Sequence, residues 1–184
     1  SLSFNSEDFI KLLISNNKVK KIIQVGANDG SRDDFLRNCL DQNMEALFIE
    51  PIESAFLKLK LNYADFKKVN FINKAVDINL GKKNIYSVNP TDFEYYKRKY
   101  KNEDVDWLSV LASFDKNHLI NHGIKEKHII SKMIDCTRFK DLIQEYNFED
   151  LDLLVVDTEG YDGVLVKNFI ENLRIRPTII FEWI

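Results

Sequence analysis

Short apolar segments alternate with amphipathic helical segments along this 184-residue chain, and this alternation is its strongest constraint on the fold. Short apolar runs are typical of strands that are buried on both faces of a sheet. Strands that alternate with helices indicate an α/β protein with a mainly parallel sheet, which binds ligands at the carboxyl ends of its strands. The predicted strands are 20–25, 46–50, 69–76, 84–88, 132–136, 151–156 and 178–183, and the predicted helices are 6–16, 32–42, 53–62, 139–146 and 162–173.

Charge and composition exclude several classes of protein. The chain carries 26 Lys and Arg residues against 29 Asp and Glu residues, a net charge of −3, whereas dedicated nucleic-acid-binding proteins are usually basic. It has no apolar run long enough for a transmembrane helix and no signal-peptide pattern. We therefore expect a cytoplasmic protein with one domain over residues 1–184, which begins with a helix within residues 1–19. The two cysteines and three histidines do not match the spacing of zinc sites, so no metal is expected.

A glycine turn, Gly26-Ala-Asn-Asp-Gly30, follows the first predicted strand. Its GxxxG spacing differs from the GxGxxG of dinucleotide-binding proteins and from the phosphate loop of nucleotide hydrolases. Glycines permit a tight turn against which a ligand can lie, and the N-terminus of the predicted helix 32–42 offers N–H groups to a carboxylate. Glu50 ends the second predicted strand, where a carboxylate can accept hydrogen bonds from both ribose hydroxyls. These features fit an adenosine ligand without a diphosphate, such as S-adenosylmethionine; a plain turn beside a solvated Glu50 is the alternative.

Three acids, Asp157, Glu159 and Asp162, follow the most apolar predicted strand, with glycines at 160 and 163. Acids crowded at the mouth of a sheet can shift one another's pKa and act as proton donors or acceptors. A GTPase also has an Asp at a strand end, but it needs a phosphate loop that this sequence lacks. The alternative, in which one acid caps the next helix and another meets solvent, stays open, with Asp162 as the expected cap.

Two further features point toward ligands. Asp77 follows the predicted strand 69–76 and could accept a hydrogen bond from an adenine amine, or could be a solvated turn residue. Residues 89–107 combine aromatic rings with lysines and an arginine, which suits sugar rings and acidic or phosphorylated acceptors. A solvated helix with a few core aromatics is the alternative there. We interpret residues 89–128 as a variable segment on the acceptor side of the domain.

Six segments match one known family in order and spacing: IIQVGANDG (22–30), ALFIEP (46–51), NKAV (73–76), LASFDKNHL (111–119), LDLLVVDTEGYD (151–162) and RPTIIFEW (176–183). On these segments the sequence resembles the FkbM-like methyltransferases, which use S-adenosylmethionine on a class I, Rossmann-type fold. The resemblance implies a doubly wound sheet with the strand order 3-2-1-4-5. The family usually continues past the last strand with a helix and a final hairpin, so we expect a cofactor-binding core without that hairpin.

The glycine turn, the acids and the resemblance together assign roles to individual residues. The predicted cofactor-binding residues are Gly26, Ala27, Asn28, Asp29, Gly30, Glu50, Pro51, Asp77, Asp157 and Gly160. The predicted substrate-binding residues are Ser113, His118 and Tyr161, and the predicted catalytic residues are His118, Asp157 and Glu159. The sequence departs from the family at Gln24, where many members have Asp, and at Phe35, where Pro is usual, while Asp34 corresponds to an acid often found after the turn.

We therefore expect an S-adenosylmethionine-dependent O-methyltransferase whose product is S-adenosylhomocysteine. The acceptor, a hydroxyl of a glycan or other secondary metabolite, is implied by the resemblance alone. A general base would speed the transfer by about 10²–10⁴-fold, and His118, Glu159 and Asp157 are its candidates. His122 and His128 are interpreted as surface or structural residues. Two alternatives stay open: an NAD-dependent oxidoreductase, which the missing GxGxxG opposes, and a non-catalytic cofactor-binding domain. The oligomeric state is also open, with a homodimer as one option.

Overall fold

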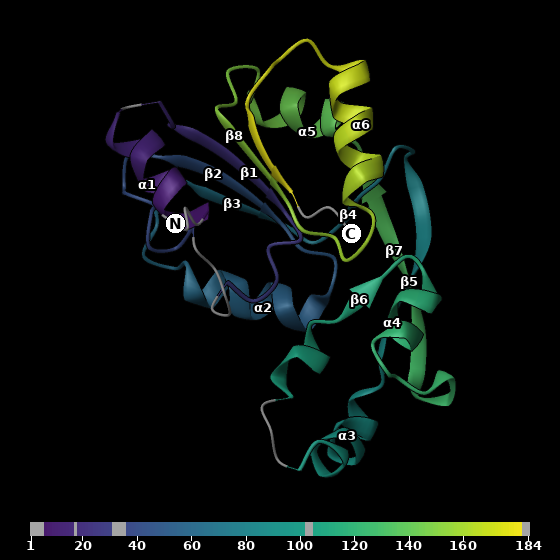
Figure 1. Ribbon diagram of the computed structural model, residues 1–184. Coiled ribbons are helices and arrows are strands. Elements are labelled where there is room, and N and C mark those ends of the chain that lie inside the picture. The colour runs from purple at the N-terminus through teal and green to yellow at the C-terminus, as the bar shows by residue number, and fades with distance from the viewer. Residues whose placement is uncertain (1–5, 17, 31–35, 102–104, 182–184) are drawn as a thin grey trace, which may run out of the picture.

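The computed structural model describes residues 6–16, 18–30, 36–101 and 105–181. The strands of these residues form two sheets (Figure 1). The first sheet has five parallel strands in the order β3-β2-β1-β8-β9. These strands are β1 (Lys21–Val25), β2 (Glu45–Ile49), β3 (Val69–Ile72), β8 (Leu153–Val156) and β9 (Thr178–Phe181).

Helices pack on both faces of the first sheet (Figure 1). Successive side chains of a strand point to opposite faces of the sheet, so the apolar residues of β1 pack in two hydrophobic cores, one on each face. Ile22 packs in the core that holds residues of α1 and α2, and Ile23 packs in the core that holds residues of α5 and α6. The four helices are α1 (Ser6–Ser15), α2 (Glu53–Asn62), α5 (Phe139–Tyr146) and α6 (Asp162–Asn172). The predicted α/β fold with a mainly parallel sheet is confirmed, and it is Rossmann-like.

The predicted strand order, 3-2-1-4-5, does not match the strands as they are counted along the chain. On the side of β1 away from β2, the next strands are β8 and then β9. They have these numbers because four strands of a second sheet come between β3 and β8 in the sequence. The second sheet has the order β4-β7-β5-β6, with long antiparallel pairing of β5 and β7. Its strands are β4 (Ala75–Val76), β5 (Gly81–Val88), β6 (Ala112–Ser113) and β7 (Ile129–Thr137).

The single strand predicted over 69–76 is wrong, because the chain leaves the first sheet after β3 and enters the second at β4. Asn73 lies at this break and donates from its Nδ2 to the carbonyl oxygens of Glu50, at 2.8 Å, and Pro51, at 3.2 Å. A side chain bonded to the backbone in this way takes the place of the strand ladder. After the break, β4 pairs in parallel with β7 of the second sheet.

The helix predicted over 32–42 is not found in its described part. Residues 36–39 form turns, in which the amides of Cys39 and Leu40 both donate to the carbonyl oxygen of Leu36. Leu36 and Cys39 are still buried, so the apolar spacing correctly indicated the inward side of this segment. Residues 31–35 lie outside the described residues, as do the two positions noted there, Asp34 and Phe35.

The segment 89–128 lies beside the second sheet (Figure 1). Its buried residues form a small core of their own with Val88. Tyr96 is fully buried in that core, whereas Tyr95 is exposed, so the aromatic residues divide between structure and surface. The helices of this segment are η1 (Pro90–Asp92), α3 (Phe93–Lys99), η2 (Asp106–Ser109), α4 (Lys116–Asn121) and η3 (Glu126–His128). Among the described residues, no helix has the length and apolar character needed to cross a membrane.

Candidate functional site

A cleft that is open to solvent lies at the carboxyl ends of β1, β2 and β8. Its opposite wall comes from the second sheet, including Ala75 and Ile85, and from residues 112–114. The strand order reverses between β1 and β8, which is where parallel sheets of this kind bind ligands. The predicted site residues that line the cleft are Gly26, Asn28, Glu50, Pro51, Ser113, Asp157 and Glu159.

Gly26 joins three strand ends at the floor of the cleft. Its φ is +75°, and a Cβ placed on it would lie 1.7 Å from the carbonyl oxygen of Asp157. The amides of Gly26 and Ala27 both donate to the carbonyl oxygen of Ile49, at 3.0 and 3.1 Å. Only glycine fits this backbone conformation and this close approach, which explains why the chain has a glycine at position 26.

The rest of the turn has further left-handed residues. Asn28 has a φ of +55° and Gly30 a φ of +69°, and a Cβ on Gly30 would lie 2.7 Å from the ring of Tyr63. The carbonyl oxygen of Asp29 accepts a hydrogen bond from the Asn62 side chain at 2.7 Å. Ala27 and Gly30 are buried and do not line the cleft, so the turn presents chiefly Gly26 and Asn28 to a ligand.

Glu50 is a buried carboxylate whose position the turn fixes. It is only 5% exposed, and it lines the cleft at the end of β2. Its Oε2 accepts from the Asn28 amide and its Oε1 from the Ile52 amide, both at 2.8 Å. Burial raises the pKa of Glu50 to about 7, although the two amides act in the opposite direction. A carboxylate has about four acceptor sites, so two remain for the hydroxyls of a ligand.

The loop after β8 carries the acids that were predicted at the mouth of the sheet. The Asp157 amide donates to the carbonyl oxygen of Val25, and its exposed side chain lines the cleft. Glu159 has a left-handed φ of +52°, which is unusual for a residue with a side chain. Its carbonyl oxygen accepts a hydrogen bond from the hydroxyl of the buried Ser113 at 3.0 Å. Ser113 therefore fixes the loop against the second sheet.

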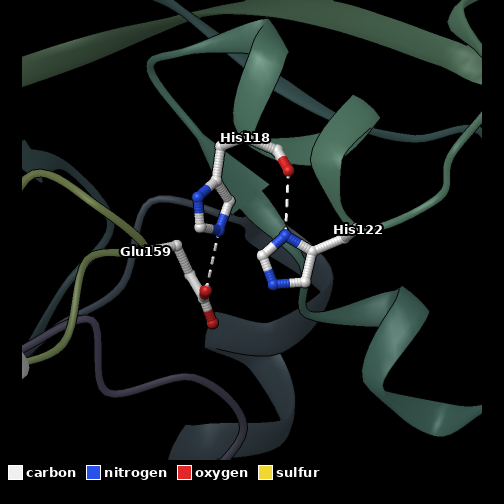
Figure 2. Close-up of side chains that lie close together, drawn as sticks. All are labelled: His118, His122 and Glu159. Carbon is white, nitrogen blue, oxygen red and sulfur yellow. Dashed lines mark hydrogen bonds and ion pairs between the residues drawn. The ribbon is translucent and has the colours of Figure 1, made fainter. Parts of the chain in front are cut away.

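His118 reaches the same loop from α4 (Figure 2). Its Nε2 lies 3.1 Å from Oε2 of Glu159, although the two residues are far apart in the sequence. The imidazole lies close to Gly160, where a Cβ would be 3.3 Å from its Nδ1. The structure thus brings together three predicted site residues that come from two different elements.

A model of the methyltransferase FkbM domain matches residues 24–184. The chain belongs to this family. The match makes it a methyltransferase and confirms the resemblance read from the six sequence segments. No curated protein matches the chain significantly.

In this FkbM methyltransferase domain, Asp77 and Tyr161 lie beside the cleft and bind each other. The Tyr161 hydroxyl donates to Oδ1 of Asp77 at 2.7 Å. Burial is the main cause that raises the pKa of Tyr161, and the hydrogen bond to the Asp77 carboxylate raises it further. Lys83 lies 3.2 Å from Oδ2 of Asp77, with its ammonium over the rings of Phe114 and Tyr161 at 4.2 and 4.6 Å. The adenine contact of Asp77 and the substrate contact of Tyr161 stay predictions.

Sequence reasoning missed three residues of the FkbM domain's site. Lys83 and Lys74 were not singled out, although Lys74 lines the cleft. His122 was interpreted as a surface or structural residue, but its ring lies beside His118 with a centroid distance of 4.4 Å. The signal that could have found it is its spacing of four residues from His118, which places both on one face of a helix. The prediction that Asp162 caps the next helix is wrong, because Tyr161 is the N-cap of α6 and Asp162 is its first residue. The Asp162 carboxylate instead accepts a hydrogen bond from the Thr158 amide at 2.6 Å, within the loop before the helix.

Proposed function

We propose that this chain is an S-adenosylmethionine-dependent O-methyltransferase that acts on a hydroxyl of a glycan or other secondary metabolite. The observation that carries the proposal is the buried Glu50, held by the Asn28 amide at the end of β2 with acceptor sites to spare. Its place beside the glycine turn suits the ribose of an adenosine, and the family match supplies the methyl transfer.

The residues present fit this cofactor in charge and shape. The carboxylate of Glu50 would accept hydrogen bonds from the ribose hydroxyls, and a phosphate on the ribose would be repelled by it. The backbone of Gly26 and Asn28 would lie along the amino-acid end of the cofactor. When bound, the cofactor supplies a methyl group that its sulfonium already activates. The product of its use is S-adenosylhomocysteine.

The protein's own part is to orient an acceptor hydroxyl and to remove its proton. Orientation within a closed site accounts for much of the rate of such in-line transfers. The pair His118 and Glu159, at 3.1 Å, stands at the acceptor side of the cleft, and Asp157 lies nearer the glycine turn. As the oxygen–methyl bond forms and the sulfur–methyl bond breaks, one of these groups would take the hydroxyl proton. In the product, S-adenosylhomocysteine, the sulfur would be a neutral thioether in place of the sulfonium.

The acceptor would enter from the segment 89–128. Residues of this segment, Val110 and 112–114, form the wall of the cleft opposite the glycine turn. Its outer surface carries Lys125, whose ammonium lies 4.4 Å from the centroid of the exposed Tyr95 ring. Such a cation–aromatic surface suits a sugar ring or an acidic acceptor.

Methyl transfer to candidate acceptors tests this proposal. S-adenosylmethionine with an isotopically labelled methyl group is incubated with the protein and a panel of hydroxylated acceptors, including glycan extracts. We expect label in at least one acceptor, with the rate lowered about 100-fold by Glu159→Gln and unchanged by Glu126→Gln, an exposed carboxylate outside the cleft. Transfer of the label to no acceptor, together with binding of NADH in place of S-adenosylmethionine, would contradict the proposal.

A further inference from the structure

Two imidazoles and one carboxylate converge at the edge of the cleft. His118 lies in α4, His122 is the residue that caps the C-terminus of this helix, and Glu159 comes from the loop after β8 (Figure 2). Each offers one ligand atom, and these atoms all lie within 4.8 Å of one another. We propose that these three residues bind a divalent transition-metal ion of the zinc class on the acceptor side of the cleft. The site itself follows from these residues, and its role in methyl transfer rests on the proposed function.

The spacing of the three groups is close to that of a metal site. Bonds of about 2.0–2.1 Å to a tetrahedral ion place neighbouring ligand atoms about 3.3 Å apart. Nε2 of His118 and Oε2 of Glu159 are 3.1 Å apart, which is close to this spacing, and the proton of their hydrogen bond is released to solvent when an ion binds between them. His122 is exposed and the Glu159 side chain is 37% exposed, so both can move the remaining short distance without disturbing a packed core.

The hydrogen bond of His122 sets its ring in the state that a ligand needs. Its Nδ1 lies 2.8 Å from the carbonyl oxygen of His118. A carbonyl oxygen can only accept, so this Nδ1 carries the hydrogen and the lone pair is on Nε2. Figure 2 shows that this second nitrogen lies on the side of the Glu159 carboxylate. Histidines that bind metals usually donate their other nitrogen to a backbone carbonyl or a carboxylate in this way.

The backbone presents all three groups to one point. His122 caps α4 four residues after His118, and the two rings lie on the same side of this helix end with their centroids 4.4 Å apart. Glu159 is held in a left-handed conformation, with its carbonyl oxygen bonded to the Ser113 hydroxyl. Gly160 leaves room for the His118 ring. Left-handed residues with side chains are often found at functional sites.

Two neutral imidazoles and one carboxylate leave a bound divalent ion with a net positive charge and open coordination positions. One or two adjacent hydroxyls of an acceptor could occupy those positions, and a metal ion lowers the pKa of a hydroxyl that it binds. The hydroxyl proton then passes to Asp157 or to water, the oxygen–methyl bond forms, and the sulfur–methyl bond breaks. In this arrangement His118 and Glu159 hold the ion, and Asp157 or water takes the proton in their place.

Metal binding by the full chain, prepared without a histidine tag, tests the site. Calorimetric titration with Zn²⁺ should show one ion per chain, and Co²⁺ should give the absorption spectrum of a four-coordinate site. His122→Ala and Glu159→Gln should each weaken Zn²⁺ binding by about 100-fold or more. Glu126→Gln, which removes an exposed carboxylate outside the cluster, should leave it unchanged. Binding that is absent from the parent, or equally tight in His122→Ala, would overturn the inference.

A second measurement separates this inference from the proposed function. His122 is exposed and does not line the cleft, so His122→Ala should bind S-adenosylhomocysteine as tightly as the parent while it loses the ion. If the parent binds S-adenosylhomocysteine but not Zn²⁺, the metal site is wrong and the proposed cofactor stands. If Zn²⁺ binds as expected but S-adenosylhomocysteine does not, the metal site stands and the proposed function is wrong.

Discussion

The α-carbon of Gly26 lies directly against the carbonyl oxygen of Asp157, where an added Cβ would be only 1.7 Å away. This contact ties the end of β1 to the loop that follows β8, since the amide of Asp157 also donates to the carbonyl oxygen of Val25. The glycine turn and the acidic loop therefore form one unit across the point where the strand order reverses.

Gly26→Ala should destabilise the fold because the methyl group would clash with the Asp157 carbonyl. We expect a loss of about 3 kcal/mol in the free energy of unfolding, measured by urea denaturation. Gly81→Ala is the matched control, since Gly81 also has a positive φ, +122°, but nothing lies within 4 Å of its added Cβ. It should lose about 1 kcal/mol from backbone strain alone. Equal losses in the two variants would refute the role of the contact.

Glu50 should make the stability of the chain depend on pH. Burial raises its pKa from 4.5 to about 7 in the folded chain. The folded state therefore binds the proton more tightly, and this contribution is fully present below pH 4.5 and is lost as the pH rises through about 7. At 1.36 kcal/mol per pKa unit, the loss should be about 3 kcal/mol.

Urea denaturation of the parent and Glu50→Gln across this pH range checks this dependence. The parent should lose stability relative to Glu50→Gln as the pH rises from about 4.5 to about 7, because the amide does not titrate. Parallel profiles for the two proteins would show that the carboxylate is not perturbed by burial.

Lys83 should stabilise the junction between the two sheets. Its ammonium pairs with Asp77, which is 6% exposed, and lies over the Phe114 ring that lines the cleft. Lys83→Met would leave the Asp77 carboxylate without its cation, at an expected cost of about 2 kcal/mol of unfolding free energy. The neighbouring Lys82 forms only an exposed pair, so Lys82→Met should change stability by less than about 0.5 kcal/mol. A similar effect of both variants would contradict this role.

Ser113 should act on catalysis through the position of Glu159. Its hydroxyl donates to the Glu159 carbonyl oxygen and accepts from the Asp115 amide. Ser113→Ala should reduce stability by about 1 kcal/mol, and should lower kcat for methyl transfer with little change in the KM for the cofactor. Ser109→Ala, at an exposed hydroxyl bonded only within its own turn, is the control. An unchanged kcat in Ser113→Ala would leave the hydroxyl a purely structural role.

The sequence predicted the first sheet well because its strands are buried on both faces and therefore read as continuous apolar runs. β1, β2 and β8 are of this kind. The second sheet was underpredicted because β5 and β7 are largely exposed and carry several lysines, which weakens the apolar signal. The turn of residues 36–39 shows the opposite error, since its apolar spacing matched a helix but its backbone does not.

The candidate site was predictable where one short segment contains it. The glycine turn and Glu50 lie at adjacent strand ends, so topology alone brings them together. The approach of His118 to Glu159 depends on how α4 packs over the acidic loop, and no local pattern encodes that contact. The same holds for Lys83, which meets Asp77 only because β5 pairs with β7 in the second sheet.

Calorimetric titration with S-adenosylhomocysteine tests whether Glu50 and the glycine turn bind this cofactor. We expect micromolar binding to the parent, no binding of NADH, and about 100-fold weaker binding to Glu50→Ala, which loses its hydrogen bonds to the ribose. Glu53→Ala, at an exposed glutamate that begins α2, should bind as the parent does. Undiminished binding of S-adenosylhomocysteine to a folded Glu50→Ala, or its absence from the parent, would show that the proposed cofactor site is wrong.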